Sequence, residues 1–413
     1  MFFRPLTHIL LIAAMVAATA CSTDDTLDEE RRVDLRQPMR FGLSSAQTQT
    51  ETVVTRANLE TTGRTTFKVG TWKAFGQATQ QTVMDGYKVD YSSTAFTDYG
   101  DGYNWHYEGV NGQPLRYWDL EAYPYEFRAV SPYISGAAIT AEGLTITTPF
   151  QAQTLTNGQY NVSAADSEPC VVANVSRTEQ THEGVTGYVD TDKMKGTEIN
   201  DAGKANATRE VHLPFHHIMS KVGFRLYIGT PMPSDPDSGD SYAAWIKSIT
   251  ITAQKTGGGG LVTAGGYAAT NATGFGGGAF SVSPTTTTEE FTLLSHNLYT
   301  QDSHDLNNHT SMASALDLTA DCLQQIPQEG VKIHVVMHIQ TNHVRTSEQN
   351  FTYDSWLSLD PANTDGDTFT WEPEHKYIYY LQVPTLSKHE LYLQTCEILP
   401  WDEVQTTDIG VGL

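Results

Sequence analysis

The sequence predicts an all-β protein, and two observations favour this fold class. Of its 413 residues, 20 are tyrosine and 33 are glycine, while only 18% are charged. This composition favours strands and turns, because helices would need more Lys, Glu and Leu. In addition, short apolar runs with a period of two are bounded by Gly, Pro, Asp and Asn, which is typical of strands joined by turns. The chain is long enough for two sandwich-sized cores, so we expect two domains.

Residues 1–20 have the pattern of a signal peptide. Arg4 precedes an apolar run that is too short to span a bilayer and that ends in Ala-Thr-Ala just before Cys21. This junction resembles the lipobox of a bacterial lipoprotein, which predicts lipidation of Cys21 and a lipid anchor in the outer membrane. The alternative is an ordinary secretory signal that leaves Cys21 free. Residues 21–38 are polar and acidic, which predicts a disordered tether; this composition also resembles the surface-export signal of Bacteroidetes lipoproteins.

The clearest strand pattern runs from Lys221 to Ile228, where apolar and polar side chains alternate. Other runs of the same kind predict strands at Ile246–Thr252, Val331–Gln340, Tyr377–Val383 and Leu391–Ile398. One segment, Ser314–Ile326, has helical spacing of its apolar residues and is the helix candidate. Two low-complexity segments, Gly257–Gly278 and Pro284–Glu290, predict loops.

The predicted domain boundary lies near residue 210, because a new apolar run begins at Val211 after a long polar tract. The N-terminal domain then covers residues 39–210 and the C-terminal domain covers residues 211–413. The segment Tyr103–Tyr133 is rich in aromatic residues, which could stack on sugars or pack in a core. Because Tyr125 and Phe127 alternate with Glu126 and Arg128, core packing is the favoured interpretation.

Charge and motifs argue against several functions. With 25 Lys and Arg against 48 Asp and Glu, the net charge is −23, which repels nucleic acids. The chain has no recognised nucleotide-binding, zinc-protease or hydrolase motif, so we expect no catalytic residue and no cofactor. His334 and His338 would lie about 13 Å apart along a strand, so we expect no metal site. The acidic segments Asp235–Asp240 and Asp360–Asp367 lack EF-hand spacing and predict turns.

Three cysteines follow Cys21, namely Cys170, Cys322 and Cys396. Their spacing is not that of a metal site, and at most one internal disulfide can form among them. Each has a Val, Leu or Ile close by in the sequence, so we expect them to be thiols in the core.

Several segments, in this order, resemble the fimbrillin family of the Bacteroidales. After the lipobox come Thr55-Arg56-Ala57, Phe127–Tyr133, Leu213–Phe224, Trp371–Tyr380 and Pro400-Trp401. Together they extend over nearly the whole mature chain. The sequence departs from the family at the turn before Tyr377, where Glu374-His375 stands in place of the usual glycine.

This resemblance implies two transthyretin-like β-sandwich domains in tandem and a pilus subunit that is not an enzyme. It places the protein at the outer membrane, the cell surface and the fimbrium, with other pilin subunits as partners in a homo- or hetero-polymer. Ligands on host or bacterial surfaces are further expected partners. The alternative function is that of an uncleaved surface lipoprotein that binds glycans through its aromatic segment.

The resemblance also implies how such a subunit assembles. An arginine-specific protease removes the lipid and the first strand, and a strand from another subunit fills the groove. The removable strand would contain Met39, Phe41 and Leu43, and the donor strand would contain Ile409, Val411 and Leu413. The expected cut follows Arg56, with Arg64 as the alternative, because a cut between residues 41 and 67 removes the whole first strand and spares the next one.

Overall fold

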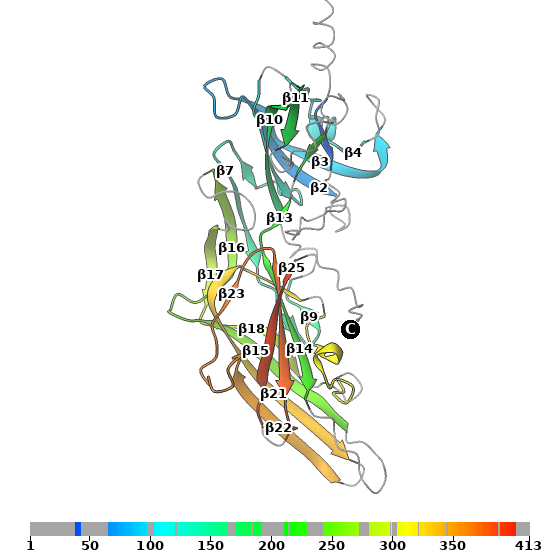
Figure 1. Cartoon of the computed structure of the whole chain (residues 1–413), viewed down its shortest axis with the longest axis vertical. Coiled ribbons are helices and arrows are strands. Elements are labelled where there is room, and N and C mark those ends of the chain that lie inside the picture. The colour runs from blue at the N-terminus through cyan, green and yellow to red at the C-terminus, as the bar shows by residue number, and fades with distance from the viewer. Residues whose placement is uncertain are drawn as a thin grey trace, which may run out of the picture.

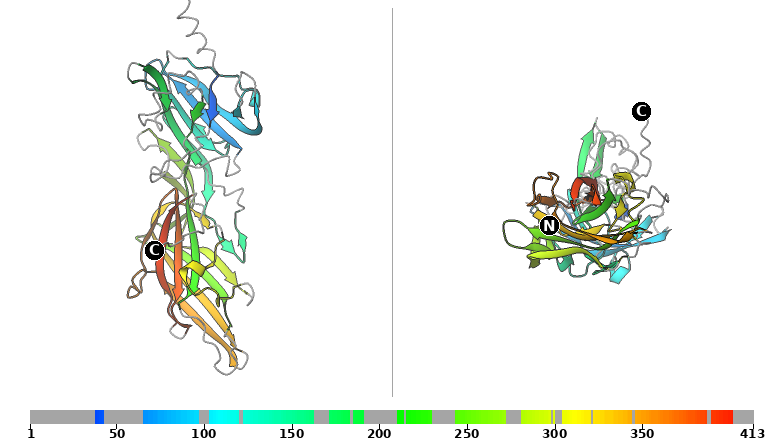
Figure 2. Two further views of the ribbon diagram at one scale, coloured as in Figure 1. Left: turned by 45° about the vertical axis from the view of Figure 1, so that its right-hand side comes forward. Right: turned by 90° about the horizontal axis from the view of Figure 1, so that it is seen from below.

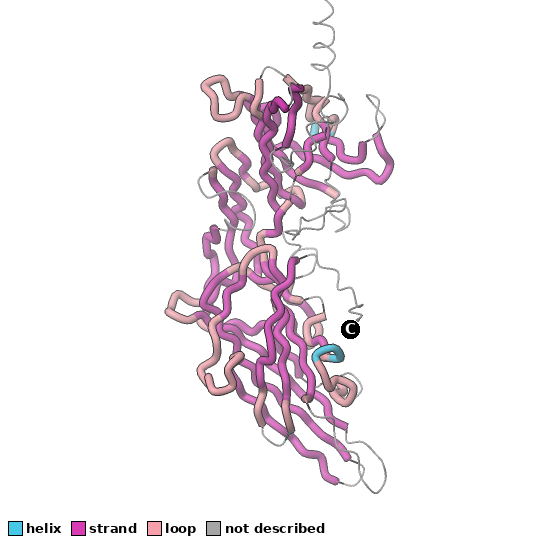
Figure 3. The backbone as a smooth tube through the Cα atoms, viewed as in Figure 1, coloured by secondary structure: helices cyan, strands magenta, loops and turns pink. Residues whose placement is uncertain are grey.

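The structure is a computed structural model of the whole chain. The residues that it describes are 38–42, 65–96, 103–119, 122–162, 171–182, 185–190, 210–213, 215–229, 243–271, 281–297, 299, 304–320, 322–343, 346–386 and 389–401. Most of these residues lie in strands, beside short 3-10 turns such as η1 (Val110–Gly112) and η5 (Met312–Ser314), as Figure 3 shows. The predicted all-β fold is confirmed. Within these ranges no helix has the length and hydropathy needed to cross a membrane.

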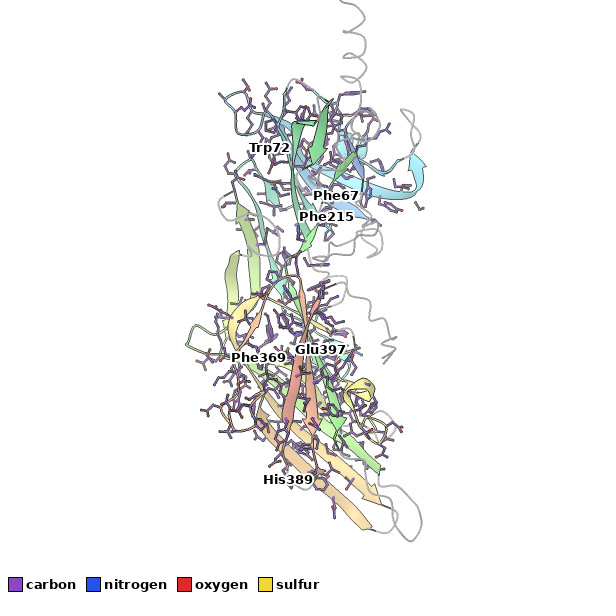
Figure 4. All side chains as sticks on the ribbon, in the orientation of Figure 1. Phe67, Trp72, Phe215, Phe369, His389 and Glu397 are labelled. Carbon is purple, nitrogen blue, oxygen red and sulfur yellow. The ribbon has the colours of Figure 1, made fainter. Side chains whose placement is uncertain are left out.

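A nine-stranded sheet forms one end of the elongated molecule (Figure 1). Its order is β11 (Val185–Asp190), β10 (Val171–His182), β5 (Tyr125–Ser131), β2 (Thr66–Lys73), β3 (Gln81–Phe96), β4 (Tyr103–His106), β1 (Arg40–Gly42) and β12 (Glu210–His212), with β13 (His216–His217) on β10. Aromatic side chains dominate its core. Phe67 packs on Phe215 with ring centroids 5.8 Å apart, and Figure 4 shows the two residues close together.

A sandwich of two sheets forms the other end, as the turned view on the left of Figure 2 also shows. One sheet has the order β19 (Leu316–Asp317), β14 (Ser220–Ile228), β24 (His375–Val383) and β25 (Tyr392–Pro400), with β20 (Leu323–Gln325) on β14. The other has the order β22 (Thr346–Trp356), β21 (Gln328–His343), β15 (Ala243–Lys255), β18 (Glu290–Asn297), β8 (Leu155–Thr156) and β9 (Gln159–Tyr160), with β23 (Phe369–Trp371) on β21. Apolar residues of both sheets form one core between them.

A four-stranded sheet lies between the two ends. Its order is β17 (Ser281–Thr288), β16 (Leu261–Thr270), β7 (Gly143–Gln151) and β6 (Ala138–Ile139). Its apolar side chains share a core with Trp72 and Val130 from the nine-stranded sheet and with Trp401 after β25. Both this sheet and the one containing β8 combine strands from before and after residue 210. The division into domains at that residue stays a prediction.

The strand predictions between residues 221 and 398 are confirmed by β14, β15, β21, β24 and β25. The predicted helix at Ser314–Ile326 is wrong. Its leucines instead pair with β14 through β19 and β20, and between these strands Ala320 and Cys322 have positive φ values of 56° and 64°, which a helix cannot contain.

The two low-complexity segments are not simply loops. Gly257–Gly260 forms a turn with positive φ at every residue, but Leu261–Thr270 is strand β16 and residues 284–288 belong to β17. The small residues of β16 permit close backbone approach. A Cβ atom on Gly266 would lie only 2.7 Å from the carbonyl oxygen of Ile146.

Candidate functional site

Strand β1 is an inserted strand of the nine-stranded sheet, between β4 and β12. It runs antiparallel to β4, with Phe41 opposite Trp105. On its other side it runs parallel to β12, with Phe41 opposite Val211 and Gly42 opposite His212. Among the described residues, β12 joins this sheet only through β1. Removal of β1 would therefore open a backbone slot with an edge on each side.

Phe41 of β1 and Met39, the residue just before β1, lie in the aromatic core and are 2% and 1% exposed. The Phe41 ring lies edge-on to three others, with centroid distances of 5.4 Å to Phe67, 6.0 Å to Tyr107 and 6.3 Å to Phe127. These contacts make the slot apolar and shape it to an aromatic or large aliphatic side chain.

The start of β1 is held by polar contacts as well. The Met39 N–H donates to the Arg116 carbonyl at 2.8 Å, and the Tyr107 hydroxyl donates to the Met39 carbonyl at 3.0 Å. Pro38 also forms a bridge to Tyr117. A strand that replaces β1 would find these donors and acceptors already in place.

The structure thus brings two predicted site residues, Met39 and Phe41, into one slot. The other predicted site residues lie outside the described part of the chain: Cys21, Leu43, Arg56, Arg64, Ile409, Val411 and Leu413. The roles predicted for them stay predictions.

A second cluster lies where the described chain ends, and sequence reasoning missed most of it. Trp401 is 3% exposed and stacks on the His217 ring with centroids 4.4 Å apart, while the Lys221 ammonium lies 4.4 Å from its ring centroid. The Trp401 N–H donates to the Glu374 carbonyl at 3.0 Å. The sequence feature that could have indicated this cluster is the Glu374-His375 pair, which stands at the turn before Tyr377 where the fimbrillin resemblance expects glycine. The cluster fixes the position of Trp401, the last described residue of the chain.

The aromatic segment is a core element, as predicted. Trp105, Tyr107, Trp118, Tyr125 and Phe127 are all at most 5% exposed, whereas Tyr117 is 43% exposed. The sugar-stacking platform is therefore absent from the described part of this segment, because its rings pack on one another. Burial raises the pKa of Tyr125 to about 12, so this hydroxyl stays neutral at physiological pH.

The histidines at 334 and 338 and the acidic segment Asp360–Asp367 have local structural roles, whereas the acidic segment Asp235–Asp240 lies outside the described residues. His334 Nε2 lies 2.7 Å from Asp354 Oδ1, and His338 Nδ1 lies 3.0 Å from Thr352 Oγ1. In the segment from Asp360 to Asp367, the last carboxylate accepts the Leu359 N–H at 2.7 Å and closes the turn. No group of three or more metal-ligating side chains occurs among the described residues.

No family model matches the chain, and no curated protein matches it significantly. Solved structures do match. A fimbrial protein from Bacteroides vulgatus is 12% identical, with 81% of this chain and 92% of that chain covered and a TM-score of 0.41. A candidate cell adhesion protein from Bacteroides uniformis is 13% identical, with 82% and 92% covered and a TM-score of 0.40. Another, from Bacteroides ovatus, is 13% identical, with 88% and 95% covered and a TM-score of 0.39.

These structural neighbours are Bacteroidales fimbrial and candidate cell adhesion proteins. Because the three TM-scores are below 0.5, function has to be inferred from the geometry of β1 and from the sequence.

Proposed function

We propose that this protein is a structural or accessory subunit of a fimbria, without a catalytic role. In this proposal it is exported as an outer-membrane lipoprotein, loses its N-terminal strand to an arginine-specific protease, and accepts a strand from another subunit at the cell surface. The supporting observation is the position of β1, which fills a slot between β4 and β12 and buries Met39 and Phe41 in the core.

The free energy gained by burying Met39 and Phe41 is compatible with replacement of β1 by another strand. Burial of a Met or Phe side chain contributes about 1.5–3 kcal/mol each, so the two anchors contribute about 3–6 kcal/mol in total. This is enough to keep the strand in place while the chain is intact. Once the chain is cut, a strand with equal or greater apolar contact can displace it.

The bounds of β1 and β2 support the proposed cleavage sites. A cut after Arg56, or after Arg64, lies between Phe41 in β1 and the first residue of β2, Thr66. Either cut separates β1 from the rest of the sheet without removing any residue of β2. A cut before residue 39 would leave the slot filled.

Assembly assays with the full chain and a C-terminal deletion test this proposal. After treatment with an arginine-specific protease, the full chain should form ladders of high mass. Deletion of Thr406–Leu413 should leave a folded monomer and abolish the ladders, because an outgoing strand contributes little to its own sandwich. If the truncated protein still polymerises, the donor lies elsewhere; if it unfolds, the segment belongs to its own core.

Lipid attachment has a separate test. The Cys21→Ala variant should lose fatty-acid labelling and membrane association, and a Cys396→Ala variant should retain both. Labelling that persists without Cys21 would contradict the lipoprotein part of the proposal.

A further inference from the structure

A pocket lies in the sandwich end of the molecule, and no residue of β1 lines it. It has a volume of about 330 Å³ and opens where β22 ends at Trp356, between the turn that begins at Asp360 and the connection from His389 to Tyr392. This volume is at the lower end of the range for small-molecule sites, about 300–1,000 Å³. Figure 4 shows His389 in the lower half of the molecule, far from Trp72 near the upper end. We propose that this pocket binds one or two rings of a neutral carbohydrate.

The turn that forms one wall of the pocket is fixed by its own contacts. The Asp367 N–H donates to the Leu357 carbonyl at 2.8 Å, and the Asp367 carboxylate accepts the Leu359 N–H at 2.7 Å. Gly366 has a φ of 78°, and a Cβ atom on it would lie only 2.7 Å from Cβ of Trp356. Glycine therefore lets the turn close against the end of β22, and the pocket is formed without a ligand.

Three carboxylates line the pocket, those of Asp354, Asp360 and Glu390. Within the described part of the chain, each has a hydrogen-bond partner on one oxygen only. Asp354 contacts the His334 ring, Asp360 accepts the Ala362 N–H, and Glu390 accepts the Tyr392 hydroxyl. The second oxygen of each carboxylate stays available as an acceptor. Sugar hydroxyl groups can donate to these oxygens, and such bonds are strong because the acceptor is charged.

Two aromatic rings, those of Trp356 and Tyr392, line the pocket beside these acceptors, and both are partly exposed. The His334 ring lies against Trp356 with centroids 4.6 Å apart, and the Tyr392 hydroxyl is held by Glu390. Both rings are therefore fixed in position before a ligand arrives. A pyranose ring has an apolar C–H face and a rim of hydroxyl groups, so aromatic rings next to open acceptors match both parts of it.

Charge and hydrogen-bond type determine which ligands fit. The three carboxylates repel sialylated, sulfated or phosphorylated ligands. They attract ammonium groups, but an ammonium group only donates hydrogen bonds. The same pocket is also lined by the uncharged polar residues Ser355 and Thr364, whose hydroxyl groups both donate and accept. A ligand with many hydroxyl groups can pair with all of these groups, which favours a neutral sugar over a polyamine.

The test measures binding to the uncut full chain by isothermal titration calorimetry. The probes are the methyl glycosides of glucose, galactose, mannose and N-acetylglucosamine, with sialyllactose and spermidine as charged probes. At least one of the neutral glycosides should bind at millimolar concentration, and sialyllactose should not. Trp356→Ala should lower the association constant at least tenfold, because it removes the ring from the pocket.

Two further variants separate binding from folding. Glu390→Gln keeps the size of the side chain and an acceptor for the Tyr392 hydroxyl, but it turns the open acceptor into a donor, so it should weaken binding about tenfold. Tyr117→Ala is the matched control, because it removes a ring that is 43% exposed and lies outside the pocket. This variant should bind like the natural chain. Circular dichroism verifies that each variant is folded.

Three outcomes would overturn this inference. The first is that none of the neutral glycosides binds, and the second is that spermidine alone binds. The third is that a glycoside binds equally well to the natural chain, Trp356→Ala and Glu390→Gln, which would place the sugar elsewhere. Because the pocket shares no residue with β1, the chain cut after Arg56 should bind the same glycoside with the same affinity. A failure of strand exchange would leave this result unchanged.

Discussion

Glu374 has a left-handed backbone conformation, with φ of 64°, and its side-chain oxygen Oε1 lies 2.6 Å from Nδ1 of His216. Its N–H donates to the Met219 carbonyl at 3.1 Å, and its own carbonyl accepts the Trp401 N–H. A left-handed conformation normally favours glycine and costs other residues about 1–2 kcal/mol. The contact with His216 offsets part of this cost, so the sequence can carry glutamate where the fimbrillin resemblance expects glycine.

This arrangement predicts the order of stability of two variants. Glu374→Ala keeps the strained backbone and loses the side-chain contact, so it should lower the free energy of unfolding by about 1–2 kcal/mol. Glu374→Gly loses the same contact but relieves the strain, so it should lie within about 0.5 kcal/mol of the natural chain. Urea denaturation measures both, with Leu359→Ala, at a 55% exposed position, as control. A glycine variant less stable than the alanine variant would contradict this assignment.

Replacement of Arg128 should lower the free energy of unfolding by a large and pH-dependent amount. Its side chain is fully buried between Trp72 and Phe75, with its guanidinium carbon 5.4 and 5.3 Å from their ring centroids, and it lies 3.5 Å from the Glu126 carboxylate. Arg128→Met should therefore cost about 3–5 kcal/mol at pH 7, because Glu126 is left as an uncompensated buried charge. Lys73→Met, which breaks an ion pair to Asp119 that is partly exposed, should cost at most about 1 kcal/mol.

The pH dependence follows from Glu126. Burial raises the pKa of this carboxyl group above its usual value, and Ser176 and Arg128 partly oppose the rise. Because the pKa of Glu126 is higher in the folded than in the unfolded chain, its protonated form favours folding. This contribution to the free energy of unfolding is present below the unfolded pKa and is lost as pH rises through the folded pKa. The destabilisation by Arg128→Met should accordingly be smaller near pH 4.5 than at pH 7. An equal loss at both values would show that packing, and not the Glu126 charge, causes it.

Cys322 and Cys396 should be alkylated slowly in the folded chain, whereas Cys170 lies outside the described residues and its burial stays a prediction. Cys322 and Cys396 are free thiols, and burial raises the pKa of both, that of Cys396 to about 12. At pH 8 iodoacetamide should label them slowly in the folded protein and rapidly in urea, because the thiolate is the reactive form. A Leu359→Cys variant supplies an exposed thiol as positive control. Equal labelling rates for Cys396 and the control thiol would contradict its partial burial against the core.

Replacement of Phe41 should change the stability of the uncut chain and leave that of the cut chain unchanged. In the uncut chain Phe41→Ala should lower the free energy of unfolding by about 3–5 kcal/mol, because it leaves a cavity among three rings. After the cut and removal of the strand, this variant and the natural chain should be equally stable. A difference that persists in the purified cut protein would show that β1 had stayed in place.

Much of the fold could be predicted because its strands alternate in the sequence. The period of two in Lys221–Ile228 predicts a strand with Val222, Phe224, Leu226 and Ile228 in the core, and β14 confirms it, although Tyr227 on the opposite face is buried as well. The helix predicted for Ser314–Ile326 was wrong because its apolar spacing also fits two short strands. The positive φ values at Ala320 and Cys322, which lie between these strands, exclude a continuous helix. Strand β16 was missed because small residues carry little apolar signal, although they permit the close approach of β7.

The candidate site could be predicted only in part. The alternation of Met39 and Phe41 indicated a strand with one buried face, and the structure confirms their burial. Its parallel pairing with β12 joins segments 170 residues apart, from Arg40 to Glu210, which no local pattern encodes. The stacking of Trp401 on His217 is equally non-local, so no local pattern encodes this contact either.

Removal of the N-terminal strand during maturation is the claim on which the proposed function depends, and the N-terminus of the protein isolated from assembled fimbriae is its sharpest test. N-terminal sequencing or mass spectrometry of the largest subunit fragment should give Ala57, or Thr65 if the cut follows Arg64. A mature chain that begins at lipidated Cys21, Val33 or Phe41 would retain residues of β1, leave the slot filled and contradict the claim.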